Sequence, residues 1–101
     1  MTDVLIMGAG SLGNHLAYGC RKKNWRVAIY DNDSLALKRT KHEIFPSRYG
    51  EWDEKIELLP VMPSLGSAYD LVVIATPPDT HLELAAWCLS ALKLEIMLLE
   101  K

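Results

Sequence analysis

The sequence predicts an α/β fold in which one parallel sheet is wound by helices on both faces. Three observations support this prediction. Short apolar runs alternate along the chain with segments of helical periodicity. The run Leu71–Ala75 is apolar at every position, as in a strand that is buried on both faces. A glycine-rich turn joins the first apolar run to the first helical segment. We therefore expect one domain over residues 1–101, with about five strands in the order 3-2-1-4-5.

The expected elements alternate in type along the chain. In order, they are a strand over Asp3–Met7, a helix over Ser11–Lys23, a strand over Arg26–Tyr30, a helix from about Leu35, a strand over Lys55–Leu59, a strand over Leu71–Ala75, a helix from about His81 and a strand over Ile96–Leu99. The second helix should end before Pro46, because a proline pushes the residue before it out of the helical region. The polar residues 47–54 are predicted to form a loop.

The helix from about His81 shows two further patterns. Thr80 and Glu83 have the spacing of a capping box at its start. Its apolar residues recur at helical spacing and should form the buried stripe. That predicted stripe consists of Leu82, Ala85, Ala86, Leu89 and Leu92.

The segment between the first two strands carries the clearest functional signal. Gly8, Gly10 and Gly13 have the G-x-G-x-x-G spacing, directly after a strand and at the start of a helix. The first glycine permits a tight turn, the second lets a pyrophosphate approach the backbone, and the third lets the helix lie close to the sheet. The free N–H groups at the helix start, including those of Ser11 and Leu12, would face the anion, and the helix dipole favours its charge.

Asp31 ends the second predicted strand and completes this pattern. Its carboxylate is placed to accept hydrogen bonds from the ribose of an adenosine, and it would repel a 2′-phosphate, so NAD is favoured over NADP. NADP stays open as an alternative, because Lys38 or Arg39 could swing toward a phosphate. Two other interpretations of this segment are a site for a different nucleotide and a glycine turn with a purely structural role.

A second motif lies in the later part of the chain. Residues 70–81 read DLVVIATPPDTH, and the chain ends LLEK. Together with the opening GAGSLG, these segments resemble the glucose–fructose oxidoreductase / inositol dehydrogenase family of nicotinamide-dependent oxidoreductases. Members of that family share an A-T-P-P-x-x-H motif at the end of strand four and an E-K-P motif at the end of strand five. The resemblance implies a Rossmann fold and covers nearly the whole chain, but only the cofactor-binding half of the family.

The resemblance implies a role for each matching residue. Thr76, Pro77 and Pro78 would line the pocket near the nicotinamide and its ribose, and His81 would begin the helix beside them. Two of these assignments have plainer alternatives. The prolines break a strand whatever else they do, and His81 is also read as a helix N-terminal residue with a local hydrogen bond.

The last two residues complete the match. Glu100 would touch the nicotinamide end of the site, and Lys101 would assist proton movement at the substrate carbinol during hydride transfer. A solvated terminal lysine is the alternative reading of Lys101. In the family a substrate domain follows the E-K-P motif, whereas this sequence stops at the lysine, so we expect that domain to be absent from this chain.

These observations predict the NAD(P)-binding domain of an oxidoreductase that moves hydride between a nicotinamide cofactor and a sugar, polyol or related hydroxyl compound. The 101 residues alone would bind the cofactor without turning over substrate. The alternative function is a stand-alone, non-catalytic NAD(H)-binding module that acts as a sensor or scaffold. A third possibility is a remnant that binds no cofactor.

Charge and composition exclude other classes of partner. The net charge of −2, without a basic stripe, argues against nucleic acid and acidic membranes, and no apolar run is long enough to span a bilayer. Cys20 and Cys88 lie in helical patterns without metal-ligand spacing, which favours reduced thiols, no metal and a cytoplasmic protein. Apolar surface on the last strand, and Trp87 on the last helix, predict self-association through one of these two elements.

Overall fold

The computed structural model describes residues 1–100, which form a five-stranded parallel sheet with helices on both faces. The strand order is β3-β2-β1-β4-β5, and every neighbouring pair is parallel. The predicted fold class and strand order are therefore confirmed. The strands are β1 (Asp3–Met7), β2 (Arg26–Tyr30), β3 (Ile56–Leu59), β4 (Ala68–Ile74) and β5 (Lys93–Leu99).

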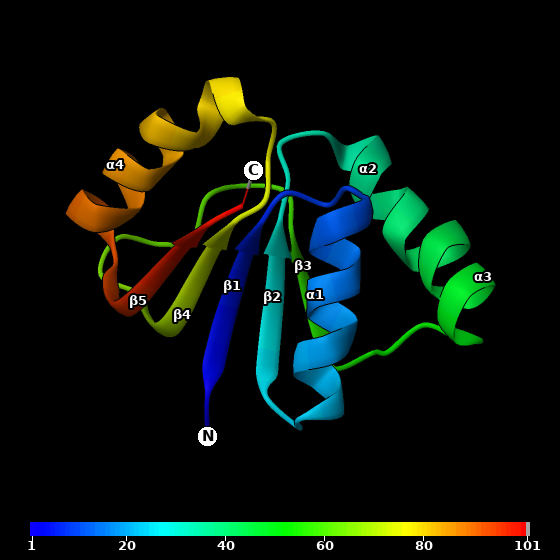
Figure 1. Cartoon of the computed structure of the whole chain (residues 1–101). Helices are drawn as coiled ribbons and strands as arrows, with labels where there is room; N and C mark the ends of the chain where they lie inside the picture. Colours follow the sequence, from blue (N-terminus) through cyan, green and yellow to red (C-terminus); the bar gives the residue numbers. More distant parts are fainter. Residues whose placement is uncertain (101) are drawn as a thin grey trace.

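The helices divide between the two faces of the sheet (Figure 1). They are α1 (Ser11–Lys22), α2 (Ser34–Arg39), a π-helical turn (Thr40–Ile44), α3 (Phe45–Tyr49), a 3₁₀ turn (Pro78–Thr80) and α4 (His81–Ala91). The first three helices pack on the face over β1, β2 and β3, and α4 packs on the opposite face. Within residues 1–100, every helix is too short or too polar to pass through a membrane.

The central strand β1 separates two hydrophobic cores. Successive side chains of a strand point to opposite faces of the sheet. Val4 and Ile6 therefore join the core under α1 and α3, whereas Leu5 and Met7 join the core under α4. All four side chains are fully buried, which explains why this strand is apolar at successive positions.

The helical backbone continues past Pro46, so the prediction of a helix end before this proline is wrong. The π-helical turn connects α2 to α3, and the Phe45 N–H donates to the Thr40 carbonyl, five residues back. Pro46 therefore falls in the first turn of α3, where the missing N–H of a proline removes no helical hydrogen bond. This arrangement buries Phe45 in the core and shortens the predicted loop, because residues 47–49 are helical.

Helix α4 begins at His81 as predicted, but only part of the predicted stripe faces the core: Ala85 and Leu92 are buried, whereas Ala86 is exposed. Leu82 and Leu89 of the predicted stripe are 81% and 65% exposed. The residues that face the core are Leu84, Ala85, Trp87 and Cys88. A 3₁₀ turn over Pro78–Thr80 directly precedes the helix. Trp87 packs against the core and is not the outward contact residue that the sequence predicted.

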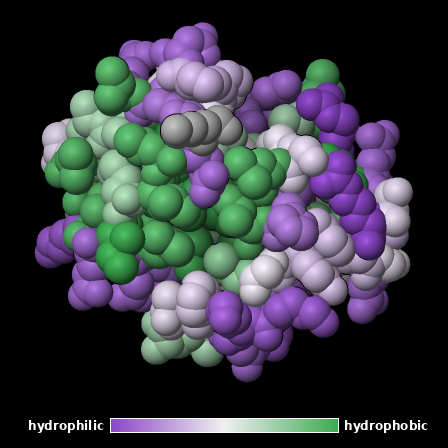
Figure 2. Space-filling model, in the orientation of Figure 1, coloured by the Kyte–Doolittle hydropathy of each residue, from purple (hydrophilic) through white to green (hydrophobic). Residues whose placement is uncertain are grey.

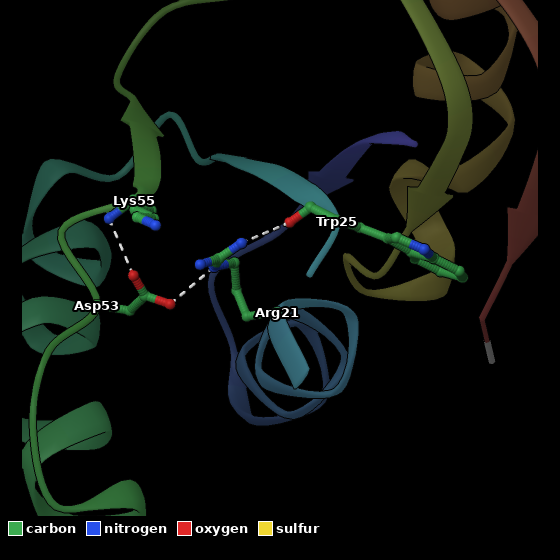
Figure 3. A network of polar contacts seen from close by, with 4 residues as sticks. All are labelled: Arg21, Trp25, Asp53 and Lys55. Atoms are coloured by element: carbon green, nitrogen blue, oxygen red, sulfur yellow. Dashed lines mark hydrogen bonds and ion pairs between the residues drawn. The ribbon is translucent and has the colours of Figure 1, made fainter. Parts of the chain in front are cut away.

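A polar network ties α1 to the two strands beside it (Figure 3). Arg21 Nε donates to Asp53 Oδ2 at 2.7 Å, and Arg21 Nη1 donates to the Trp25 carbonyl at 2.8 Å. Asp53 Oδ1 in turn accepts the N–H of Lys55 at 2.9 Å. These bonds hold the end of α1 to the segments that lead into β2 and β3.

The Asp53 network makes stability depend on pH. Burial raises the pKa of the Asp53 carboxyl, but the hydrogen bonds from Arg21 and Lys55 and their positive charges outweigh burial and lower it. A carboxyl whose pKa is lower in the folded state stabilises the fold above its unfolded pKa. This contribution disappears as the pH falls through the folded pKa.

We predict that Asp53→Asn lowers the free energy of unfolding by about 1 kcal/mol at neutral pH. The difference from the wild type should shrink as the pH is lowered below 3.8, the ordinary aspartate pKa, since the wild-type carboxylate is then being protonated. Urea unfolding at a series of pH values measures both quantities. A difference that does not change with pH would contradict this assignment.

Candidate functional site

The carboxyl edge of the sheet brings together residues that follow three different strands. Gly8 follows β1, Asp31 follows β2 and Thr76 lies two residues beyond β4. The winding of the chain reverses here, because α1 leaves β1 on one face of the sheet and α4 follows β4 on the other (Figure 1). In open α/β sheets, ligands bind beyond the carboxyl ends of the strands at such a reversal.

The first and third glycines are required by close backbone packing. Gly8 has a φ of +121°, and a Cβ there would lie 3.0 Å from the carbonyl carbon and oxygen of Ala75. Its N–H donates to the Tyr30 carbonyl at 2.7 Å. A Cβ on Gly13 would lie only 2.0 Å from the Gly8 carbonyl oxygen. Helix α1 therefore lies directly on the turn that leads into it.

Gly10 stands in a different environment, because a Cβ there would meet no atom within 4 Å. It occupies the N-cap of α1, and no side chain caps the helix. The N–H groups of Ser11, Leu12 and Gly13 have no acceptor among residues 1–100. Uncapped N–H groups and the positive end of the helix dipole thus meet an open approach, which is the arrangement that binds an anion.

The Asp31 carboxylate lies against this turn. Its Oδ2 accepts the Ala9 N–H at 2.9 Å, and its Oδ1 accepts the Asp33 N–H at 2.9 Å. A carboxylate offers about four lone-pair sites, so these two bonds leave each oxygen able to accept a further hydrogen bond. Asp33 also caps α2 by accepting the Leu35 N–H at 3.0 Å.

Asn14 is a residue of this site that the sequence analysis did not identify. It is fully buried, and its Nδ2 donates to the carbonyls of Ala9 at 3.0 Å and Gly10 at 2.7 Å. Its position in the sequence could have identified it, because it lies four residues after Gly10 and directly after Gly13. In a helix, a polar side chain at this spacing lies over the first turn.

The loop after β4 is held by hydrogen bonds among its own residues. Thr80 Oγ1 lies 2.8 Å from Thr76 Oγ1 and 2.9 Å from the Pro77 carbonyl oxygen. His81 Nε2 donates to the Thr76 carbonyl at 2.5 Å. The Thr80 hydroxyl is used inside the loop, so the predicted capping box with Glu83 does not form.

A cavity of about 350 Å³ lies between the ends of β2 and β4. Its polar walls include Asp31, Asn32 and Thr76, and its apolar walls include Met62 and Leu84. Pro77 also lines it, whereas Pro78, His81 and Glu100 do not. The volume falls within the usual range for a small-molecule pocket.

A larger hollow of about 590 Å³ lies between α1, α3 and residues 51–55, and it shares no residue with this edge. Aromatic side chains that pack on one another line it. Tyr18 stacks on Tyr49, and Phe45 meets both Tyr49 and Trp52 edge to face. We assign the hollow to packing between the two helices, because its main groups already contact one another.

The remaining predicted residues lie at the far side of the edge or outside the described residues. The Glu100 N–H donates to the Ile74 carbonyl at 3.0 Å, which places the Glu100 backbone beside the end of β4. Lys101, the predicted catalytic residue, lies outside the described residues. No cluster of His, Cys, Asp and Glu that could hold a metal ion occurs within residues 1–100.

One side of the molecule is extensively apolar. Figure 2 shows hydrophobic surface over β4 and β5, in contrast to the hydrophilic side that carries α2 and α3. On the edge strand β5, Ile96 is 62% and Leu98 is 43% exposed, whereas Leu94 and Met97 pack against the core under α4. Large exposed apolar surfaces are typical of interaction sites.

Comparison with known proteins supports the fold and does not assign a family. No protein-family model matches the sequence, and no curated protein is similar to it. The fold matches 27 chains of solved structures. One of them is a diketoreductase, described for substrate-directed dual catalysis of dicarbonyl compounds, with a TM-score of 0.62 and 22% identity. The match covers 86% of this chain and 36% of that one, so this chain spans little more than a third of its length.

We predict that Gly13→Ala destabilises the protein by about 2 kcal/mol or more, because its Cβ would overlap the Gly8 carbonyl and force the turn to move. Gly19→Ala, in the same helix, is the matched control. A Cβ at Gly19 meets no atom within 4 Å, so alanine should stabilise the helix by about 0.5–1 kcal/mol. Urea unfolding compares the two variants, and equal stabilities would show that α1 does not press on the turn.

Proposed function

We propose that this chain binds a dinucleotide, with the diphosphate at the start of α1. The observation that carries the proposal is the uncapped helix start beside Gly10, where a Cβ meets nothing within 4 Å. Gly8 and Gly13 are packed so tightly that a side chain would not fit at either position. At Gly10 the absence of a side chain instead leaves space for a ligand. Open N–H groups and the helix dipole then supply the attraction for the diphosphate.

The adenosine half would lie between the ends of β2 and β4. Asp31 keeps lone pairs that can accept hydrogen bonds from the ribose hydroxyls, and the adjoining cavity has apolar walls at Met62 and Leu84 for a base. The negative charge of Asp31 disfavours a 2′-phosphate, so NAD is the proposed cofactor. NADP is the less favoured alternative, through the exposed Lys38 and Arg39 of α2.

We further propose that the chain is the cofactor-binding domain of a cytoplasmic oxidoreductase that acts on a sugar, polyol or related hydroxyl compound. The bound nicotinamide would supply hydride transfer. Thr76, Pro77 and Pro78 would flank the nicotinamide ribose, His81 would hold their loop through the Thr76 carbonyl, and Glu100 would lie at the nicotinamide end. Lys101 would assist proton movement at the substrate. Substrate turnover would need further groups from a substrate domain, in addition to residues 1–101.

A stand-alone NAD(H)-binding module is the second candidate function. One observation favours it: Asp31, which lines the cavity together with Glu83, and His81, at the start of α4, already form hydrogen bonds to the backbone. Asp31 accepts from Ala9 and Asp33, and His81 donates to Thr76. Such groups suit binding and positioning better than proton transfer. The activity of the chain joined to a substrate domain would distinguish the two functions.

Calorimetric titration with NADH and NADPH tests the proposed binding. We predict that the wild-type chain binds NADH more tightly than NADPH, and that Gly10→Val abolishes binding of both without unfolding the protein. Its branched side chain would fill the approach to the helix start, which is open to solvent in the folded protein. Gly19→Ala serves as the folded control. Absence of heat with either cofactor in the wild type would refute the proposal.

We predict that Asp31→Ala weakens NADH binding by about 1–3 kcal/mol, because a charged hydrogen-bond acceptor is lost. Binding of NADPH should weaken less, since repulsion of the 2′-phosphate is lost as well. Asp31 also holds the Ala9 N–H, so the thermal midpoint must be measured alongside the affinity. Unchanged affinity for NADH would show that this carboxylate does not contact the ribose.

We also propose that the chain associates with a second copy through β5 or α4. The uncovered edge of β5 presents unpaired backbone groups next to Ile96 and Leu98, and Leu82 and Leu89 project from α4. Light scattering should then give a mass above that of the monomer as the concentration rises. Ile96→Lys should restore the monomer mass if β5 forms the contact, and Leu89→Lys should restore it if α4 does.

A further inference from the structure

We infer that Asn14 is the positioning residue of the diphosphate site, because it turns two carbonyl groups away from the place where the anion would lie. The inference rests on the proposed binding of a dinucleotide at the start of α1. The Asn14 side chain is buried beneath the turn and does not contact the ligand. Its role is to keep the N–H groups at the helix start available to the ligand.

Asn14 makes three hydrogen bonds to the turn that precedes it. Its Nδ2 donates to the Ala9 carbonyl at 3.0 Å and to the Gly10 carbonyl at 2.7 Å, and its backbone N–H donates to the Gly10 carbonyl at 3.0 Å. Both hydrogens of the amide are thus used on consecutive peptide groups. The side chain has no exposed surface, so water does not compete for these bonds.

Asp31 holds the preceding peptide group, between Gly8 and Ala9. Its Oδ2 accepts the Ala9 N–H at 2.9 Å, while Asn14 holds the Ala9 carbonyl. Gly10 follows directly and has no side chain to limit its rotation. Without the two clamps, the carbonyls of Ala9 and Gly10 could turn outward and present negative partial charge to a phosphate. With them, the carbonyls point inward, and the ordering of the turn is completed on folding, before any ligand binds.

The choice of asparagine fits this role better than a role in packing. Asparagine offers two N–H donors from one atom, whereas an ionised aspartate at this position would offer none and would add charge next to the diphosphate. Its Oδ1 is buried and has no hydrogen-bond partner among residues 1–100. A buried acceptor without a partner destabilises the fold, so the residue gives up stability while it fixes the turn.

The experiment compares Asn14→Ala with Thr40→Val as a matched control. Thr40 is also fully buried with an unpartnered oxygen, but it lies in the π-helical turn and makes no contact with the glycine turn in the hydrogen bonds described. Each variant is titrated with NADH and ADP by calorimetry and with adenosine by NMR. Thermal unfolding of each free variant shows that it is folded at the temperature of the titration.

We expect Asn14→Ala to weaken the binding of NADH and ADP by about tenfold or more, because two side-chain hydrogen bonds are lost. Adenosine, which has no phosphate, should bind unchanged, and Thr40→Val should bind all three ligands like the wild type. The amide resonances of Ser11 and Leu12 should broaden in free Asn14→Ala as the turn becomes mobile. Asn14→Ser has one hydroxyl donor and should recover part of the lost affinity. If Asn14→Ala does not fold, Asn14→Ser takes its place in the comparison.

Two results would overturn the inference while the proposed function stands. In one, a folded Asn14→Ala binds NADH and ADP as tightly as the wild type does. In the other, it loses adenosine binding to the same extent as ADP binding, which would indicate a general loss of structure. A wild-type chain that binds neither NADH nor ADP would instead refute the proposed function, and the inference with it.

Discussion

The contact between helix α1 and its own entry turn is the constraint on which the rest of the structure depends. Gly13 lies so close to the Gly8 carbonyl that no side chain fits between them. This contact holds α1 against the turn after β1, and the N-cap residue Gly10 has no side chain to cap the first N–H groups of the helix. A helix displaced by one side chain would separate those groups from Asp31, which reaches the same turn from β2.

The site is therefore formed by the ends of β1, β2 and β4, which are held in register. Gly8 bonds to the Tyr30 carbonyl, and Ala75 donates its N–H to the Met7 carbonyl at 2.8 Å. These bonds extend the β1–β2 and β1–β4 pairing past the strand ends and fix the turn, the acid and the Thr76 loop relative to each other. Burial, followed by the negative charge of Asp31, raises the pKa of Tyr30, so the phenol at this edge stays protonated at neutral pH.

Binding and association occupy different parts of the surface. The polar groups of the site gather at the carboxyl edge, whereas the apolar surface spreads over β4 and β5 (Figure 2). The helices over β1 to β3 cover Val73 of β4 but leave Ile96 and Leu98 of β5 exposed. The same winding that creates the switch point thus leaves the last strand of the described chain exposed at the sheet edge.

The sequence alone determined the fold class, the strand order and the position of the glycine turn, because these follow from local periodicity and from a spacing with steric meaning. It also placed Asp31 at a strand end. It could not determine which face of α4 is buried, since Leu82 and Leu89 have the spacing of a core stripe and are nevertheless exposed, while Cys88 packs in the core. The passage of the helix through Pro46, and the buried contacts of Asn14 beneath the turn, were likewise decided by tertiary structure. Each of these depends on which groups meet in space, and that information is absent from the spacing of residues along the chain.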